Sequence, residues 1–299
     1  SLHDALPISI WGVYNLLPEH LRKNVIGVIV NKFRGDLTLF DEGIRIIEED
    51  FKIPVLGVLP YLPFNLGFED SASLKNFVQQ PRNKKLDIAV IAYPYMSNYN
   101  DFEPLIADDE VFVEFVSSNI SLEKFDLVIL PGSKLVIKDL IWLKQTGLFE
   151  QIKNYKKDIC AICGGYEMMF ESLDDIYSLE NENALKEDGF GLIDDVIVFE
   201  KEKVLKKESY ELFGTKIDGF EIHHGMCKKY SLSFEKENFK GTFVHKIFDN
   251  NEFRTNYFKS IKTDYVGFDF QEYKKQTVDN FISTLKEKLD VNHILKSIS

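Results

Sequence analysis

The sequence predicts an α/β protein made of two successive parts, each built around parallel strands. Short apolar runs rich in β-branched residues recur along the chain, as expected of strands that are buried on both faces of a sheet. Segments with apolar residues at helical spacing alternate with these runs, which favours strand–helix–strand units. A polar stretch at residues 79–85 interrupts the alternation and marks a boundary between the two parts.

The first part shows one strand–helix–strand unit. Residues 25–30 form a continuous apolar run, residues 39–51 have the periodicity of a helix, and residues 54–60 form a second short apolar run. Only two convincing strands precede residue 80, so this sheet is expected to be half of a larger one.

The second part begins with the same alternation of strands and helices and then changes to strands and turns. Its expected strands lie at residues 86–92, 111–115 and 127–130. A helix is expected at residues 139–149, and beyond Gly189 short strands alternate with turns, as at residues 196–199 and 219–223. A late helix at residues 277–289 carries one apolar stripe, which favours core packing over a partner site.

Composition narrows the functional classes. The chain has 299 residues, of which 44% are hydrophobic, and this supports one large or two ordinary domains. Its net charge of -12 is spread along the sequence, which argues against a nucleic-acid binder. Three cysteines, no secretory signal and no apolar run near the roughly 20 residues of a membrane span indicate a cytoplasmic protein with no membrane role.

The first residues form a separate case. Residues 1–8 resemble the translation of a common sequencing adapter read into an open frame, so we exclude them from fold reasoning as a non-native artefact. The natural chain is then expected to begin further upstream. The alternative is an ordinary disordered start.

The most informative motif centres on Cys163. An apolar run ends there, two glycines follow, and a helix-like segment begins at Tyr166. A nucleophile on such a sharp turn needs small neighbours, which Ala161 and Gly165 supply. The start of a helix also favours the thiolate form. We therefore predict that Cys163 is a nucleophile, against the alternative of a buried structural cysteine.

Cys160 and Cys163 also form a Cys-x-x-Cys pair, which is typical of redox centres and of half zinc sites. No second pair exists and Cys227 stands alone, so we expect no metal. Cys160 falls inside the apparent strand, where its side chain would point into packing. The pair therefore gives weak support to redox chemistry.

A thiol nucleophile needs a base and an oxyanion site. His223, His224 and His245 are candidates for the base, and spacing alone does not choose between them. Pro131-Gly132-Ser133-Lys134 follows a strand, so the N–H of Gly132 or Ser133, with that of Gly164, could receive an oxyanion. The alternative for this loop is a plain strand-to-helix turn.

Several motifs together resemble the cobyric acid synthase family, the glutamine-dependent amidases of cobalamin biosynthesis. The resemblance extends over residues 25–258. The motifs are Asn31-Lys32-Phe33-Arg34-Gly35-Asp36, Glu69-Asp70-Ser71, Ser97-Asn98-Tyr99-Asn100-Asp101-Phe102, Pro131-Gly132-Ser133-Lys134, Ile162-Cys163-Gly164-Gly165-Tyr166, Asp175 with Glu180, Gly189-Phe190-Gly191-Leu192 with Lys203, Gly219-Phe220-Glu221-Ile222-His223 and Gly241-Thr242-Phe243-Val244-His245.

The resemblance implies a domain organisation. Residues 9–80 would be the C-terminal remnant of a P-loop-type, dethiobiotin synthetase-like ATP-binding domain, and residues 85–262 a class I glutamine amidotransferase domain. Residues 263–299 would form a helical tail. The full-length enzyme would use ATP and Mg²⁺, glutamine and a corrinoid substrate, adenosylcobyrinic acid a,c-diamide, whose peripheral carboxylates become amides. The amidotransferase domain itself would bind no cofactor.

The resemblance also assigns roles to residues. Cys163 would be the nucleophile and His245 its base. The oxyanion would be held by Gly132, Ser133 and Gly164. The remaining implied nucleotide- or substrate-binding residues are Asn31, Glu69, Asp70 and His223.

The sequence departs from the family pattern at several points. It contains no Gly-x-x-x-x-Gly-Lys-Ser/Thr motif, which we attribute to truncation. Glu167 stands where Gln is typical and Lys246 where Gly is usual, while Ala92 and Tyr95 replace residues that are commonly basic. Other class I domains carry a Glu two residues after the histidine, and Ile247 occupies that place here. The cobyric acid synthase branch also lacks this Glu. What orients His245 stays open.

Two other classes of reading are kept. One is a related amidotransferase, either cobyrinic acid a,c-diamide synthase or the glutaminase subunit of a muropeptide-amidating enzyme. The Asn31 and Glu69-Asp70-Ser71 motifs favour cobyric acid synthase over these. The other is a non-catalytic protein on the same fold, because folds host many functions.

Overall fold

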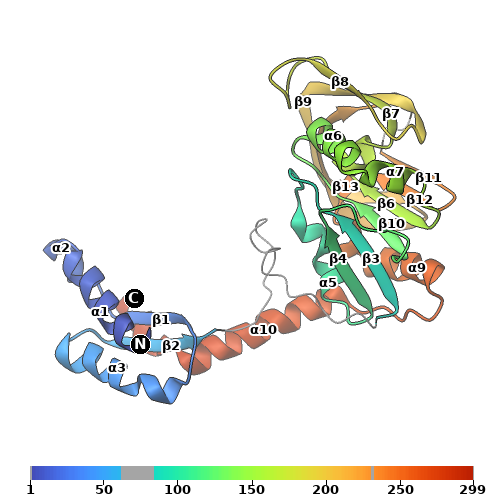
Figure 1. The fold of residues 1–299 in the computed structure, drawn as a ribbon. Helices are drawn as coiled ribbons and strands as arrows, with labels where there is room; N and C mark the ends of the chain where they lie inside the picture. The colour runs from blue at the N-terminus through green and yellow to red at the C-terminus, as the bar shows by residue number, and fades with distance from the viewer. Residues whose placement is uncertain (1, 62–83, 230–231, 299) are drawn as a thin grey trace. The chain divides into compact units, whose positions relative to one another are not determined.

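A computed structural model of the chain describes residues 2–61, 84–229 and 232–298 (Figure 1). The chain divides into two compact units, one formed by Ser1–Leu66 with Glu272–Ser299 and the other by Gly67–Gln271. The C-terminal helices therefore belong with the first unit, whereas the sequence predicts a separate tail from residue 263. Most of the expected boundary stretch at residues 79–85 lies outside the described residues.

The first unit contains a two-stranded parallel sheet with helices. Its strands are β1 (Val28–Phe33) and β2 (Val55–Pro60), with Val28 opposite Val55. Its helical elements are α1 (Leu2–Leu16), α2 (Glu19–Arg22), η1 (Leu37–Phe40), α3 (Asp41–Arg45), the π-helix η2 (Ile46–Asp50), α10 (Phe270–Lys288) and α11 (Val291–Ile298). The expected strand–helix–strand unit is present.

The start of α1 and the apolar stripe of α10 differ from what the sequence predicts. Residues 2–8, which we excluded from fold reasoning, form part of α1. The apolar stripe of α10 was expected to pack in a core, but Val278 and Ile282 are 45% and 41% exposed. At these two positions the expectation of core packing is wrong. The apolar residues that do form the unit's core are Val30, Phe33, Phe40, Ile47 and Ile53.

The second unit is built on a six-stranded sheet with the strand order β11-β12-β6-β5-β3-β4. All neighbouring strands in it are parallel except β11 and β12. The strands are β3 (Leu86–Ile91), β4 (Val111–Val116), β5 (Leu127–Leu130), β6 (Asp158–Ile162), β11 (Ser233–Lys236) and β12 (Phe239–Thr242). The parallel strands expected from sequence are thus confirmed, and the mixed α/β class with them.

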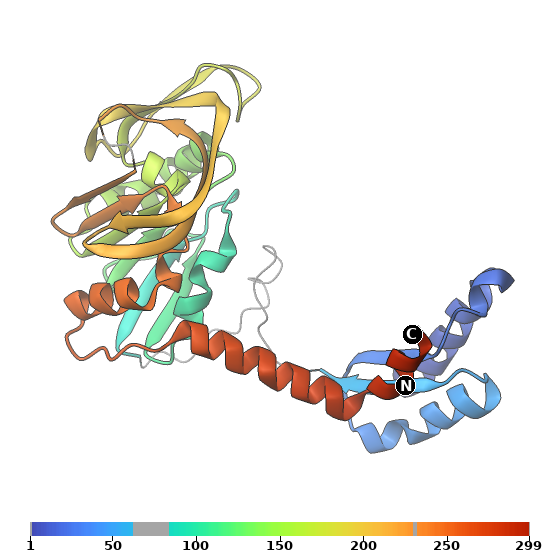
Figure 2. The same cartoon turned by 180° about the vertical axis from the view of Figure 1, so that it is seen from behind.

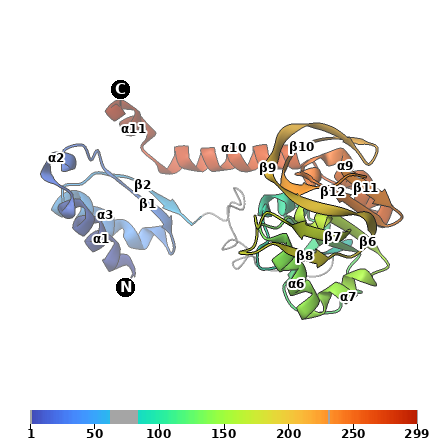
Figure 3. The same ribbon diagram turned by 90° about the horizontal axis from the view of Figure 1, so that it is seen from above.

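Helices cover both faces of this sheet. Figure 3 shows α6 (Val136–Thr146) and α7 (Leu148–Lys153) on one side and α9 (Asn251–Ile261) on the other. The single helix expected at residues 139–149 is two helices, because Gly147 adopts a left-handed conformation with φ 79° and ends α6. The shorter helical elements are η3 (Tyr99–Phe102), α5 (Glu103–Ile106), α8 (Gly164–Glu167) and η4 (Ile247–Asp249).

A second sheet follows the order β13-β10-β9-β7-β8. Figure 2 shows the long curved hairpin of β9 (Ile193–Leu212) and β10 (Thr215–Met226). The short strands expected at residues 196–199 and 219–223 are therefore parts of much longer ones. The remaining strands are β7 (Phe170–Asp175), β8 (Leu185–Asp188) and β13 (Val244–His245). In the part of the chain that the structure describes, no helix combines the length and apolar character needed to cross a membrane.

Candidate active site

Cys163 lies on the sharp turn between β6 and α8. Its φ of 51° and ψ of -114° are strained for a residue other than glycine, and such strain concentrates at functional sites. The turn needs its glycines, because a Cβ on Gly165 would lie 2.2 Å from the carbonyl oxygen of Leu130. The helix-like segment after the turn is shorter than expected, since α8 ends at Glu167 and β7 begins at Phe170. Cys163 is 5% exposed, and its thiol hydrogen-bonds the carbonyl oxygen of Ile222 at 3.6 Å.

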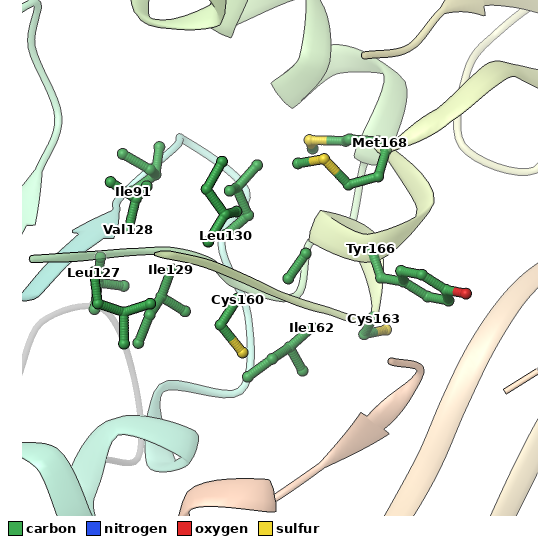
Figure 4. Close-up of a cluster of buried hydrophobic side chains, with 14 of the residues drawn as sticks. Ile91, Leu127, Val128, Ile129, Leu130, Cys160, Ile162, Cys163, Tyr166 and Met168 are labelled. Atoms are coloured by element: carbon green, nitrogen blue, oxygen red, sulfur yellow. The ribbon is translucent and has the colours of Figure 1, made fainter. Parts of the chain in front are cut away.

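Cys160 has a different environment from Cys163. Figure 4 shows Cys160 among buried side chains of β5 and β6, with Cys163 beyond the end of β6. Burial raises the pKa of the Cys160 thiol to about 12, so this sulfur stays protonated and unreactive. Neither cysteine is in a disulfide. Among the described residues, no group of three His, Cys, Asp or Glu side chains is arranged to hold a metal ion.

His245 is buried beside Cys163 and is held by a carboxylate that the sequence analysis did not assign. Its Nδ1 lies 2.7 Å from Oδ2 of Asp101, whose Oδ1 accepts the N–H of Lys246 at 2.8 Å. The ring also stacks on Phe220, with centroids 5.0 Å apart. Asp101 is therefore the group that orients His245.

The pKa of His245 depends on both Asp101 and Cys163. Burial lowers the pKa of its imidazole, but the charge of Asp101 and the charge and hydrogen bond of Cys163 outweigh burial and raise the pKa to about 10. The imidazolium form is thus favoured next to the sulfur. The Nε2 atom also lies 3.1 Å from Nδ2 of Asn98.

The loop from Pro131 to Lys134 packs directly against this turn. A Cβ on Gly132 would lie 3.0 Å from Cε1 of His245, and a Cβ on Gly164 would lie 2.8 Å from the backbone nitrogen of Ser133. The three residues that the sequence names for an oxyanion site, Gly132, Ser133 and Gly164, therefore lie close to this turn and to His245.

A cavity of about 270 Å³ opens onto the sulfur. Two carboxyls, Glu167 and Glu180, and two lysines, Lys134 and Lys203, are among its lining residues. Burial raises the pKa of Glu167 to about 8, and burial together with the charge of Glu167 raises the pKa of Glu180 to about 8. Both carboxyls are therefore largely neutral at pH 7.

His223 lines the same cavity but is held differently from His245. Its Nδ1 lies 2.8 Å from the carbonyl oxygen of Gly225, and its Nε2 lies 3.3 Å from Oε2 of Glu221. Its ring stacks on Phe243 with centroids 4.0 Å apart, and burial lowers its pKa. Both ring nitrogens are engaged in contacts within β10, which suits a structural wall of the cavity. His224 has a similar contact, because its Nδ1 lies 2.9 Å from the carbonyl oxygen of Glu200.

The sequence also predicts nucleotide- or substrate-binding roles for Asn31, Glu69 and Asp70. Asn31 lies in β1 of the first unit, exposed, with its Oδ1 accepting the N–H of Lys32 at 2.8 Å. Glu69 and Asp70 lie outside the described residues. Asp101 was missed although it sits in a motif that carried the family resemblance. The available signal was its place in the segment that joins two parallel strands, β3 and β4, beyond the carboxyl end of β3, where functional side chains gather.

The chain is similar in sequence to known proteins. Residues 87–253 match the family model of the CobB/CobQ-like glutamine amidotransferase domain. The chain is 65% identical over 290 residues to a protein of Acinetobacter baylyi named cobyric acid synthase, covering 97% of this chain and 62% of that protein. It is 36% identical over 318 residues to the cobyric acid synthase of Clostridium tetani, covering 97% of this chain and 64% of that protein. A solved glutamine amidotransferase superposes with a TM-score of 0.44 at 10% identity, covering 58% of this chain and 97% of that structure. The chain thus spans less than two thirds of the length of these two cobyric acid synthases.

Proposed function

This chain belongs to the CobB/CobQ-like glutamine amidotransferase family, and on that premise we propose that its second unit releases ammonia from glutamine at Cys163. One observation carries the proposal. The strained turn at Cys163 faces an imidazole that Asp101 holds at 2.7 Å, with a loop of backbone N–H groups alongside. A nucleophile, a base and a group that orients the base are the parts that thiol catalysis of acyl transfer needs.

The proposed reaction has two halves. The Cys163 thiolate attacks the side-chain carbonyl carbon of glutamine, and the N–H groups of Ser133 and Gly164 receive the oxyanion. His245 protonates the departing nitrogen, so ammonia leaves and a thioester of glutamate remains. A water molecule then gives a proton to His245 and adds to the thioester, and the returning proton regenerates the thiol as glutamate leaves.

The name of the relatives suggests the wider role. We propose that the ammonia serves the amidation of peripheral carboxylates of adenosylcobyrinic acid a,c-diamide, in an ATP- and Mg²⁺-dependent synthase acting in the cytoplasm. The loop after β1 does not fit a triphosphate. β1 is followed by Arg34, Gly35 and Asp36, and the Asp36 carboxylate accepts the N–H of Thr38 at 2.9 Å. No glycine-rich phosphate cradle is formed there, and no step above runs through ATP.

The experiment is ammonia release from glutamine by the full chain. Cys163→Ala should abolish release, and a glutamine-analogue electrophile should label Cys163 rapidly in the unaltered chain. Cys227→Ser is the control and should leave both unchanged, because Cys227 does not line the cavity at the sulfur. Release that survives Cys163→Ala would overturn the nucleophile assignment. Absence of both release and labelling in the unaltered chain would favour a non-catalytic protein on this fold.

A further inference from the structure

Two carboxyls outside the proposed catalytic group hold the loop that carries Ser133. The first is Asp139, in the first turn of α6 and 0% exposed. Its Oδ2 accepts the Ser133 hydroxyl at 2.6 Å, and its Oδ1 accepts the N–H of Tyr95 at 3.1 Å. The Ser133 hydroxyl in turn accepts the N–H of Leu135 at 3.0 Å. Asp139 thus ties the loop both to its own helix and to the segment that follows β3.

The second carboxyl is Glu180, which reaches the same loop from the turn after β7. Its Oε2 accepts the N–H of Val136 at 2.6 Å. This N–H begins α6, whose own N-cap residue, Leu135, provides no side-chain cap. Glu180 therefore caps α6 from a distant segment.

The turn that carries Glu180 is itself fixed. Asp175 is 0% exposed and accepts the N–H of Leu179 at 2.7 Å and the N–H of Glu180 at 3.0 Å. Asp175 and Glu180 belong to the motifs behind the family resemblance, yet neither has a role in the reaction written above. Their hydrogen bonds give them one, because the chain of contacts runs from Asp175 through Glu180 to the start of α6.

The position of Ser133 decides whether its N–H can help the reaction. Gly164 follows the nucleophile directly, and a Cβ there would lie 2.8 Å from the nitrogen of Ser133. A donor to an oxyanion is effective only within a narrow range of distance and direction, and a misplacement of 1 Å can cost roughly 100-fold in rate. The loop that carries Ser133 is not covalently near Cys163, so other contacts must set the separation.

We propose that Asp139 and Glu180 are positioning residues that hold the Ser133 N–H toward the oxyanion formed at Cys163. Asp139 acts on the side chain of Ser133, and Glu180 fixes the backbone three residues later. This inference rests on the proposed function. Burial raises the pKa of Asp139 to about 6. The protein therefore keeps a carboxyl in a place that disfavours its charge, and there the carboxyl accepts the Ser133 hydroxyl.

The test measures glutamine hydrolysis and thiol alkylation on the same full-chain variants. Glu180→Ala and Asp139→Ala should lower kcat by roughly 10- to 100-fold while KM changes by less than about 3-fold. Alkylation of Cys163 by iodoacetamide should keep its rate, because that reaction needs no oxyanion site. Glu180→Gln retains an acceptor for the Val136 N–H and should recover most of the activity.

Controls separate this role from general damage. Glu182→Gln changes an exposed carboxyl on the same turn and should leave kcat unaltered. If Asp139→Ala fails to fold, Ser133→Ala removes the same hydrogen bond but keeps the bond from the Tyr95 N–H to Asp139, and it should lower kcat by about 10-fold. An unchanged kcat in Glu180→Ala, or a loss that appears in KM, would overturn the proposal. Failure of the proposed function would instead show as no ammonia release by the unaltered chain.

Discussion

Glu167→Gln should stabilise the protein at neutral pH and flatten the dependence of its stability on pH. Glu167 lies at the end of α8, one turn after the nucleophile, and is 2% exposed. Its Oε1 has no hydrogen-bond partner among the described residues. Burial raises the pKa of this carboxyl from 4.5 to about 8, and the N–H of Gly225 and the charge of His245 oppose the shift only in part.

The size of the effect follows from the shift. At pH 7 the unfolded chain has an ionised Glu167, with a pKa of 4.5, whereas the folded chain must keep it protonated. Each pH unit between the unfolded pKa and pH 7 costs about 1.4 kcal/mol, so the penalty is about 3 kcal/mol. The folded state binds more protons between pH 4.5 and about 8, so stability falls as pH rises through that window. Glutamine does not ionise, and the penalty disappears.

The assay is urea unfolding of the original chain and the variant in steps from pH 5 to pH 8. The variant should be more stable by less than about 1 kcal/mol at pH 5 and by up to about 3 kcal/mol at pH 7. Part of the rise in the pKa of Glu180 comes from the charge of Glu167, so the difference between the two chains reports on Glu167 and on its coupling to Glu180. Glu182→Gln is the matched exposed control and should not change the slope. Parallel pH profiles, or a less stable variant at pH 7, would refute the reasoning.

Two further substitutions test the surroundings of His245. Asp101→Asn should lower kcat for ammonia release by at least about 100-fold, because an amide can accept only one of the two N–H groups that the carboxylate accepts now, from His245 and from Lys246. Steady-state kinetics of glutamine hydrolysis measure this, and a loss of less than tenfold would argue against the role of Asp101. Lys246→Gly should keep or raise the free energy of unfolding, by up to about 1 kcal/mol, because Lys246 has a φ of 64° that glycine adopts without strain. Thermal unfolding measures this, and a fall of Tm by several degrees would contradict it.

The sequence predicts the parts of this structure that local patterns specify. β5 is a continuous apolar run, and β3 and β6 are apolar except at Asp87 and Asp158. Such runs are typical of strands in a parallel sheet that is covered on both faces. The turn at Cys163 is visible for a similar local reason, because its small neighbours are needed where the turn passes close to the backbone of β5. The family model confirms the amidotransferase class.

Other features depend on contacts that span the chain and leave no local signal. Asp101 precedes His245 by 144 residues, and only the folding of η3 against β13 brings the two together. The extent of β9, from Ile193 to Leu212, is also hidden. Much of that strand is exposed and charged, so its pairing with β10 and not its own hydrophobic pattern maintains it.

The turn at Cys163 also makes the two halves of the proposed anion receptor unequal. Gly164 is joined to the reactive sulfur's own residue by one peptide bond, so thermal motion carries donor and nucleophile together. Ser133 lies in the loop after β5, so its N–H can move relative to the sulfur. A substitution or a bound regulator that displaced only the Ser133 N–H would slow glutamine hydrolysis without changing the reactivity of the thiol. Such an enzyme would react normally with a thiol-directed reagent although its turnover was reduced.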